Sequence, residues 1–166
     1  MNSTPDDRLI TLRQRLVTRL KAQGIRLATA ESCSGGWIAK VCTDLPGSSD
    51  WFECAIVSYS NASKHRLLGV PTEIIEGYGA VSEETVLAML DGVFAHSDAG
   101  LGVAVSGIAG PGGGSAAKPV GTVWICAGLR HAQARARRFE FSGDRNQVRL
   151  QSLIAAFECL LEHLDA

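Results

Sequence analysis

The chain has 166 residues, of which 46% are hydrophobic and 20% are charged, and its formal net charge is −1. This length and composition predict a single globular domain over residues 1–166 with a sizeable buried core, and they exclude a long disordered tail. The near-neutral charge argues against nucleic acid and membrane surfaces as partners, so we expect a small-molecule ligand or another protein.

The cysteines predict reduced thiols rather than a disulfide framework or a zinc site. They are odd in number, widely spaced and without a C-x-x-C pair. The N-terminal sequence is polar and acidic, and no apolar run approaches membrane-spanning length. We therefore expect a cytoplasmic protein that uses no metal. The cysteines are Cys33, Cys42, Cys54, Cys126 and Cys159.

The first predicted elements are an amphipathic helix over residues 6–22, ended by Gly24, and a strand over residues 25–30. A polar segment then precedes a second helix. Unpaired N–H groups and the helix dipole favour an anion such as phosphate at a strand-to-helix turn. The plainer alternative is a helix cap with local hydrogen bonds only. The candidate substrate-binding residues here are Glu31, Ser32, Cys33, Ser34, Gly35 and Gly36.

The next strand, predicted over residues 51–58, is flanked by hydroxyl and amine side chains. Ser48 lies in the tight loop before it, and Tyr59 follows it. A short helix capped by Ser60 or Asn61 then carries Lys64. A further amphipathic helix begins after Ser82, and we assign no chemistry to it.

A strand over residues 101–105 leads into a glycine-rich segment, residues 106–121. Glycines allow main-chain N–H groups to approach a ligand closely, which is typical of anion-binding loops. The spacing matches neither the dinucleotide-binding fingerprint nor the P-loop, and a flexible linker between strands is the alternative. The candidate binding residues are Ser106, Gly107, Gly110, Gly112 and Gly113.

Two strands over residues 120–129 and 137–141 predict a hairpin after the glycine-rich segment. Asp144 is the predicted cap of a last helix, where Arg145 and Arg149 share a face. These arginines are candidates for contact with a phosphate or a neighbouring subunit, or form a solvated helix face.

Several long motifs resemble the family of the C-terminal domain of competence/damage-inducible protein CinA, which includes free-standing nicotinamide-nucleotide (NMN) amidohydrolases. The resemblance covers about residues 16–161 and implies a single α/β domain, a three-layer sandwich with a central mixed sheet flanked by helices. It further implies hydrolysis of NMN to nicotinic acid mononucleotide and ammonia in pyridine-nucleotide salvage, without a cofactor. Ser34 stands where the family commonly has threonine, and it keeps the hydroxyl. The motifs are TAESCSGG, PGSSxWF, VSYSNxxK, GAVSEE, VSGIAGPxGGSxxKPVGTVW and FxGDRxxVR.

Amide hydrolysis needs a nucleophile, a base and donors for the oxyanion, and none of the four histidines lies in a motif typical of a catalytic base. A lysine partly removed from water can be neutral and accept a serine proton. We therefore predict Ser48 as the nucleophile and Lys64 as the base, with Tyr59 relaying a proton or positioning the lysine. The glycine-containing segments would bind phosphate and ribose and supply an oxyanion hole.

Two alternatives remain at this point. Cys33 is a second candidate nucleophile, because a thiol at a helix N-terminus has a lowered pKa. The chain is alternatively a non-catalytic nucleotide-binding or protein-interaction module. We also expect a homo-oligomer, namely a dimer, because small enzymes of this kind often bury an apolar edge across a two-fold axis.

Overall fold

A computed structural model describes residues 5–166, so residues 1–4 of the predicted 1–166 domain lie outside the described residues. The described strands form one five-stranded sheet in the order β2-β1-β3-β4-β5. β1 pairs in parallel with β2 and β3, whereas β4 pairs antiparallel with β3 and β5. The elements are α1 (Pro5–Gln23), β1 (Leu27–Glu31), α2 (Trp37–Thr43), the 3₁₀ turn η1 (Ser48–Asp50), β2 (Phe52–Val57), α3 (Asn61–Leu68), α4 (Thr72–Tyr78), α5 (Glu83–Ala95), β3 (Leu101–Gly107), β4 (Thr122–Leu129), β5 (Arg135–Glu140) and α6 (Arg145–Leu164).

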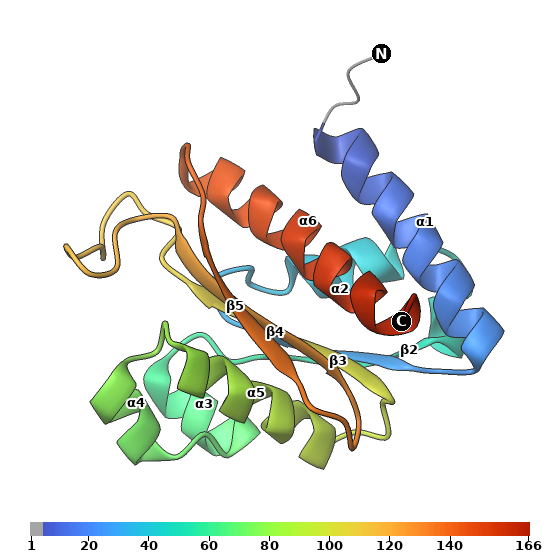
Figure 1. Ribbon diagram of the computed structural model, residues 1–166, viewed down its shortest axis with the longest axis horizontal. Coiled ribbons are helices and arrows are strands. Elements are labelled where there is room, and N and C mark those ends of the chain that lie inside the picture. The colour runs from blue at the N-terminus through green and yellow to red at the C-terminus, as the bar shows by residue number, and fades with distance from the viewer. Residues whose placement is uncertain (1–4) are drawn as a thin grey trace.

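The sheet is the middle layer of a three-layer α/β sandwich (Figure 1). Helices α1, α2 and α6 cover one face, and α3, α4 and α5 cover the other. Each face has its own cluster of buried apolar side chains. This arrangement confirms the predicted fold class, a central mixed sheet flanked by helices.

Side chains along β3 alternate between the two cores, as the period of a strand requires. Val103 and Val105 belong to the core beneath α1 and α6, whereas Ala104 belongs to the core beneath α5. A Cβ atom on Gly102 would lie 2.7 Å from Cδ1 of Leu90 in α5. The small residues on this face of β3 therefore allow α5 to pack closely on the sheet.

A second close approach joins α5 to α3. A Cβ atom on Gly92 of α5 would lie 2.0 Å from the carbonyl oxygen of Leu68, the last residue of α3. No larger residue fits at position 92 unless α3 moves. Because α3 also carries Lys64, this contact helps to set the position of Lys64 against the sheet.

Most predicted elements lie within a few residues of their expected positions. The helix predicted over residues 6–22 is α1, and Gly24 follows it with a φ of 64°. The predicted hairpin is the antiparallel pair β4 and β5. Ser82 caps α5, and Asp144 caps α6 by accepting a hydrogen bond from the N–H group of Gln147 at 2.9 Å.

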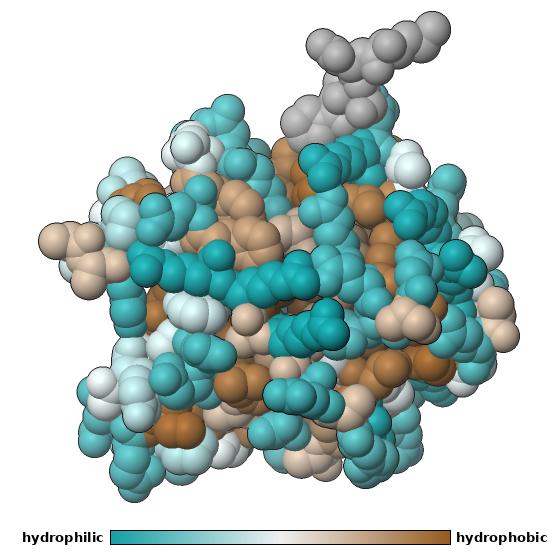
Figure 2. All heavy atoms as spheres, in the orientation of Figure 1, coloured by the Kyte–Doolittle hydropathy of each residue, from teal (hydrophilic) through white to brown (hydrophobic). Residues whose placement is uncertain are grey.

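Hydrophilic side chains cover much of the face shown in Figure 2, and the hydrophobic surface there is divided into separate patches. None of the helices within residues 5–166 combines the length and the apolar character needed to cross a membrane. The large hydrophobic residues that are most exposed are Ile10, Val57, Tyr59, Leu67, Tyr78 and Val120.

Candidate active site

The parallel strands β1, β2 and β3 end at the same edge of the sheet, which is where open α/β sheets bind ligands. Ser32 follows β1, Ser58 follows β2, and Gly107 ends β3. The N–H group of Ser32 donates to the carbonyl of Val105 at 3.0 Å, and that of Ser58 donates to the carbonyl of Glu31 at 2.9 Å. Main-chain hydrogen bonds thus hold the three strand ends side by side.

Lys64 contributes a buried amine to this edge. Its side chain extends from α3 and is only 1% exposed. The Nζ atom donates to Oγ of Ser32 at 2.8 Å. It also donates to the carbonyl oxygens of Ser58 at 2.9 Å and Tyr59 at 3.2 Å. None of the ion pairs within residues 5–166 includes Lys64, and burial lowers the pKa of its amine below the usual value.

The structure does not bring Ser48 to Lys64, which corrects the predicted pair. Ser48 begins η1 before β2, whereas Lys64 follows β2. The six residues of β2 span roughly 20 Å, so residues that flank the strand lie at opposite ends of the sheet. The serine that contacts Lys64 is Ser32, which we predicted from the sequence as a substrate-binding residue.

Glu31 lies beneath the turn after β1 and has no exposed surface. Its Oε2 accepts hydrogen bonds from Oγ of Ser34 at 2.7 Å and from the N–H groups of Gly36 at 3.0 Å and Ile38 at 3.2 Å. Its Oε1 accepts from the N–H group of Ala39 at 2.9 Å. Glu31 is therefore not placed to contact substrate, contrary to the sequence-based assignment.

Cys33 is a buried thiol in the turn that follows β1. It is 6% exposed and belongs to the core beneath α1 and α6. A Cβ atom on Gly107 would lie 3.1 Å from its Sγ. Burial raises the pKa of the thiol to about 11. A thiol with this pKa remains protonated at neutral pH, which disfavours Cys33 as the nucleophile.

The predicted glycine-rich segment follows β3 and is anchored at one point by α6. The carbonyl of Gly110 accepts a hydrogen bond from Nη1 of Arg145 at 2.8 Å. Gly112 and Gly113 are exposed, and neither makes a hydrogen bond within the described part of the chain. Ser106 is engaged elsewhere, because its hydroxyl donates to the carbonyl of Ala80 at 2.7 Å.

Tyr59 and Arg145 form the exposed rim of the site. Tyr59 is 58% exposed, and its hydroxyl accepts a hydrogen bond from Nη2 of Arg145 at 2.9 Å. Both hydrogen-bond partners of Arg145, this hydroxyl and the carbonyl of Gly110, are uncharged. No ion pair between described residues includes Arg145, so its charge is available to an anion.

Arg149, one turn further along α6, holds the turn that contains Ser32. Its Nε donates to the carbonyl of Cys33 at 3.1 Å, and its Nη2 donates to the carbonyl of Ser34 at 3.0 Å. Its guanidinium carbon lies 5.2 Å from the ring centroid of Trp37, within the range of a cation–π contact. The two arginines that the sequence placed on one helix face thus bind different parts of one site.

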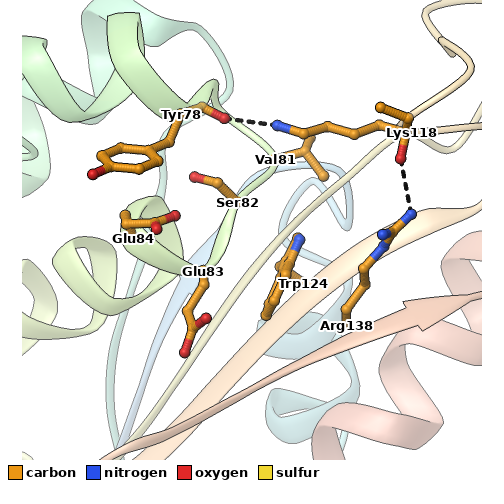
Figure 3. A pocket seen from close by; sticks show the side chains of 9 residues that line it. Tyr78, Val81, Ser82, Glu83, Glu84, Lys118, Trp124 and Arg138 are labelled. Atoms are coloured by element: carbon orange, nitrogen blue, oxygen red, sulfur yellow. Dashed lines mark hydrogen bonds between the residues drawn. The ribbon is translucent and has the colours of Figure 1, made fainter.

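Residues of this site line one hollow in the surface, and they do not line a second one. One, of about 470 Å³, is lined by Gly35, Gly36, Trp37, Lys40, Asn146 and Arg149. Figure 3 shows the other, of about 350 Å³, between the start of α5, the glycine-rich segment and strands β4 and β5. There Nζ of Lys118 donates to the carbonyl of Tyr78 at 2.6 Å, which ties the glycine-rich segment to the end of α4. The residues lining this second hollow are Tyr78, Val81, Ser82, Glu83, Glu84, Ala117, Lys118, Trp124 and Arg138.

No group of three or more His, Cys, Asp or Glu side chains among residues 5–166 is arranged to hold a metal ion.

The contact between Ser32 and Lys64 could have been predicted from the sequence. Ser32 and Lys64 each follow a predicted strand, and the carboxyl ends of neighbouring parallel strands meet at one edge.

Comparison with known proteins places these residues in a wider group. The sequence model of the CinA C-terminal domain matches residues 9–164. The nicotinamide-nucleotide amidohydrolase PncC of Pseudomonas putida is 51% identical over 156 residues, covering 94% of this chain and 97% of that protein. The protein of the same name from Escherichia coli K12 is 46% identical over 155 residues, covering 93% of this chain and 94% of that protein.

The fold has a counterpart among solved structures. The crystal structure of competence/damage inducible protein CihA from Agrobacterium tumefaciens superimposes with a TM-score of 0.92 at 39% sequence identity. The match covers 96% of each chain.

Proposed function

The chain belongs to the CinA C-terminal domain family, and on that premise we propose that it hydrolyses NMN to nicotinic acid mononucleotide and ammonia. The two PncC relatives, at 46% and 51% identity over nearly the whole chain, support this substrate. The observation that carries the chemistry is the 2.8 Å contact between Oγ of Ser32 and the buried Nζ of Lys64. We assign the reaction to the cytoplasm, in keeping with the free thiols of all five cysteines.

Ser32 is the nucleophile of this proposal and Lys64 is the general base. Neutral Lys64 accepts the hydroxyl proton of Ser32 as Oγ attacks the carboxamide carbon of NMN. The tetrahedral intermediate then collapses: the C–N bond breaks, and protonated Lys64 gives its proton to the departing ammonia. Lys64 next removes a proton from water, and the resulting hydroxide attacks the acyl-serine ester. The ester C–O bond then breaks, protonated Lys64 returns its proton to Oγ of Ser32, and the released acid ionises to the carboxylate product.

The environment of Lys64 favours this role. A lysine surrounded by carboxylates would remain an ammonium, but the partners of Nζ here are one hydroxyl and two carbonyls. Burial further disfavours the charged form and lowers the pKa. The oxyanion of the intermediate would be stabilised by main-chain N–H groups at the ends of β1 and β3, next to Ser32.

We assign the phosphate of NMN to Arg145 and to the N–H groups of Gly112 and Gly113. Arg145 has only uncharged partners, and the two glycines make no hydrogen bond within residues 5–166. An arginine and main-chain N–H groups are a common combination for a phosphate. Tyr59 contacts both Arg145 and Lys64, so it would couple phosphate binding to the base.

The test is release of ammonia from NMN by the purified protein, with nicotinic acid mononucleotide identified by mass spectrometry. We expect Ser32→Ala and Lys64→Ala each to reduce kcat by roughly 10²–10⁴-fold, and the double variant to be little worse than either. Ser48→Ala is the matched control and should retain activity, because Ser48 lies at the other end of β2.

Two outcomes would contradict the proposal. An inactive Ser48→Ala together with an active Ser32→Ala would reject Ser32 as the nucleophile. Binding of NMN by the intact protein without any release of ammonia would instead favour a non-catalytic binding module.

A further inference from the structure

We infer that Glu31 is a positioning residue for catalysis: its buried carboxylate fixes the turn over residues 32–36 and thereby sets the contact between Oγ of Ser32 and Nζ of Lys64. The inference rests on the proposed function for the identity of the reaction. Its geometric basis is independent of the substrate, because it concerns only contacts within the chain.

The carboxylate of Glu31 is saturated by donors of the chain itself. Besides the four donors described above, Oγ1 of Thr29 donates to Oε1 at 3.2 Å, so five donors share its two oxygens. A carboxylate offers about four lone-pair positions, so none remains for a substrate. No ion pair within the described residues includes Glu31, and its charge is balanced by N–H dipoles at the start of α2.

These hydrogen bonds fix the turn on both sides of Ser32. The N–H group of Ser32 is bonded to β3, and its carbonyl accepts from the N–H group of Gly35 at 3.0 Å. Glu31 holds Ser34 and Gly36 from inside the fold. Gly36 has a φ of 90°, a conformation that side chains other than glycine rarely adopt, and this conformation directs its N–H group at the carboxylate.

Glu31 and Ser32 are neighbours in the chain, and their side chains have separate roles. Successive residues at the end of a strand point to opposite faces of the sheet. Glu31 points into the start of α2, and Ser32 points toward Lys64 in α3. A rigid Glu31 on one face consequently fixes the direction of Ser32 on the other.

Only a carboxylate of this length satisfies the turn. The substitution Glu31→Gln would replace one oxygen by an NH₂ group, which cannot accept a hydrogen bond. In either orientation of that amide, at least one main-chain donor, from Ala39 or from Gly36 and Ile38, would lose its acceptor. An aspartate side chain would be one methylene too short to reach the same donors.

The test compares Glu31→Gln with the control Thr29→Val, which removes one donor to Oε1 and leaves those of Ser34 and Gly36 in place. Two rates are measured on folded protein: turnover of NMN, and modification of Ser32 by a fluorophosphonate, followed by mass spectrometry. In the second reaction Oγ of Ser32 forms a bond to phosphorus, fluoride leaves, and Lys64 accepts the hydroxyl proton.

We expect Glu31→Gln to lower kcat and the rate of Ser32 modification together by about 10-fold to 10²-fold, since a displacement of about 1 Å has effects of this size. The KM for NMN should change by less than about 3-fold, because the proposed phosphate contacts lie on α6 and the glycine-rich segment. Thr29→Val should keep both rates within about 3-fold of the wild type. A residue that only stabilises the fold would not change the rates of folded molecules.

Folded Glu31→Gln with both rates unchanged would overturn the inference, as would a raised KM at unchanged kcat, which indicates substrate contact. If Glu31→Gln does not fold, Ser34→Ala takes its place, because it removes one donor from Oε2 of Glu31. Ser34→Ala must then lower both rates relative to the wild type, by less than the roughly 10-fold to 10²-fold loss expected for Glu31→Gln. Rates equal to those of the wild type would reject the inference. Wild-type protein that is modified at Ser32 but does not hydrolyse NMN would reject the proposed substrate while leaving the comparison of variants valid. Wild-type protein that does neither would reject both.

Discussion

Lys64 combines two properties that rarely occur together in a lysine: it is 1% exposed, and its partners are all uncharged oxygens. In water the amine would be protonated at neutral pH. Removal from water lowers its pKa from the usual value of 10.5, and this shift makes a lysine suitable as a base. The pH dependence of turnover is therefore the most direct report on this residue.

We predict that kcat/KM rises with pH as Lys64 loses its proton, and that it levels off at a pH below 10.5. The sign follows from the role, because only the neutral amine can accept the proton of Ser32. The profile is measured by ammonia release between about pH 6 and pH 10. Lys64→Arg, which stays charged over this range, should be inactive throughout; a flat profile for the wild type would contradict the assignment.

Cys33 should react slowly with alkylating reagents despite its place next to Ser32. Its thiol is 6% exposed, and burial raises its pKa to about 11, so little thiolate exists at neutral pH. Cys33→Ala should retain substantial activity toward NMN. Rapid labelling of Cys33 by iodoacetamide in the folded protein, with parallel loss of turnover, would restore the thiol as a candidate nucleophile.

From the sequence we predicted Lys64 as a base candidate and Ser32 as a binding residue, and we paired Lys64 with Ser48, whereas the structure brings Ser32 to Lys64. Ser48 and Lys64 flank the same strand, and a strand separates the residues at its two ends. Proximity in the sequence was therefore misleading. The burial of Glu31 could not be predicted either, because a carboxylate in a polar segment is also typical of a ligand-binding residue. Only the structure shows that its hydrogen-bond donors are N–H groups of the chain itself.

At the scale of elements, α6 does more than cover the sheet. Its start is fixed by a capping box between Asp144 and Gln147. From this fixed start, Arg145 reaches the glycine-rich segment and Arg149 reaches the turn that contains Ser32. One helix terminus thus connects segments that are far apart in the chain.

Arg145→Gln should raise the KM for NMN by about 10-fold to 100-fold, as expected for loss of a charge-assisted hydrogen bond to phosphate. Nicotinamide riboside, which lacks the phosphate, should be used equally poorly by the wild type and this variant. Arg66→Gln is the control, since Arg66 is exposed on α3 and forms no hydrogen bond or ion pair with the described residues. An unchanged KM in Arg145→Gln would exclude Arg145 from phosphate binding.

The elements themselves were largely predictable, and their lateral order was not. Apolar periodicity and the caps Ser82 and Asp144 located α5 and α6 to within a residue or two. The hairpin of β4 and β5 followed from the short turn between them. Nothing local in the chain determines that β1 lies between β2 and β3, because that order depends on contacts between distant segments.

At the scale of the whole molecule, the two edges of the sheet differ in character. β5 carries Arg135, Arg137, Arg138 and Glu140, which is typical of an edge protected from pairing. β2 is mostly apolar, and Val57 at its end is 42% exposed. An apolar edge strand is a natural place for a second copy to bind.

We therefore retain the prediction of a homodimer and assign β2 to its interface. Light scattering at micromolar concentration should give twice the mass of the chain. Val57→Lys should shift the protein toward the monomer, whereas the charge-conserving control Arg135→Lys on β5 should not. A wild-type protein that is monomeric at this concentration would refute the prediction.

The close approach of α5 to α3 has a consequence for protein engineering. Replacing a helical glycine by alanine is a standard way to stabilise a protein, and it gains roughly 0.5–1 kcal/mol where space is open. Gly77 in α4, which has no atom within 4 Å of an added Cβ, should follow this rule.

Gly92→Ala should do the opposite, because the added Cβ would lie 2.0 Å from the carbonyl oxygen of Leu68 and would displace α3. Thermal melting should show a lower midpoint for Gly92→Ala and a higher one for Gly77→Ala. Turnover should fall only in Gly92→Ala, because α3 carries Lys64. If the two variants have the same melting midpoint and the same turnover, the contact between α5 and α3 does not constrain Lys64. If they differ as expected, a design method that scores helix propensity alone would select Gly92→Ala, a substitution that disables the enzyme.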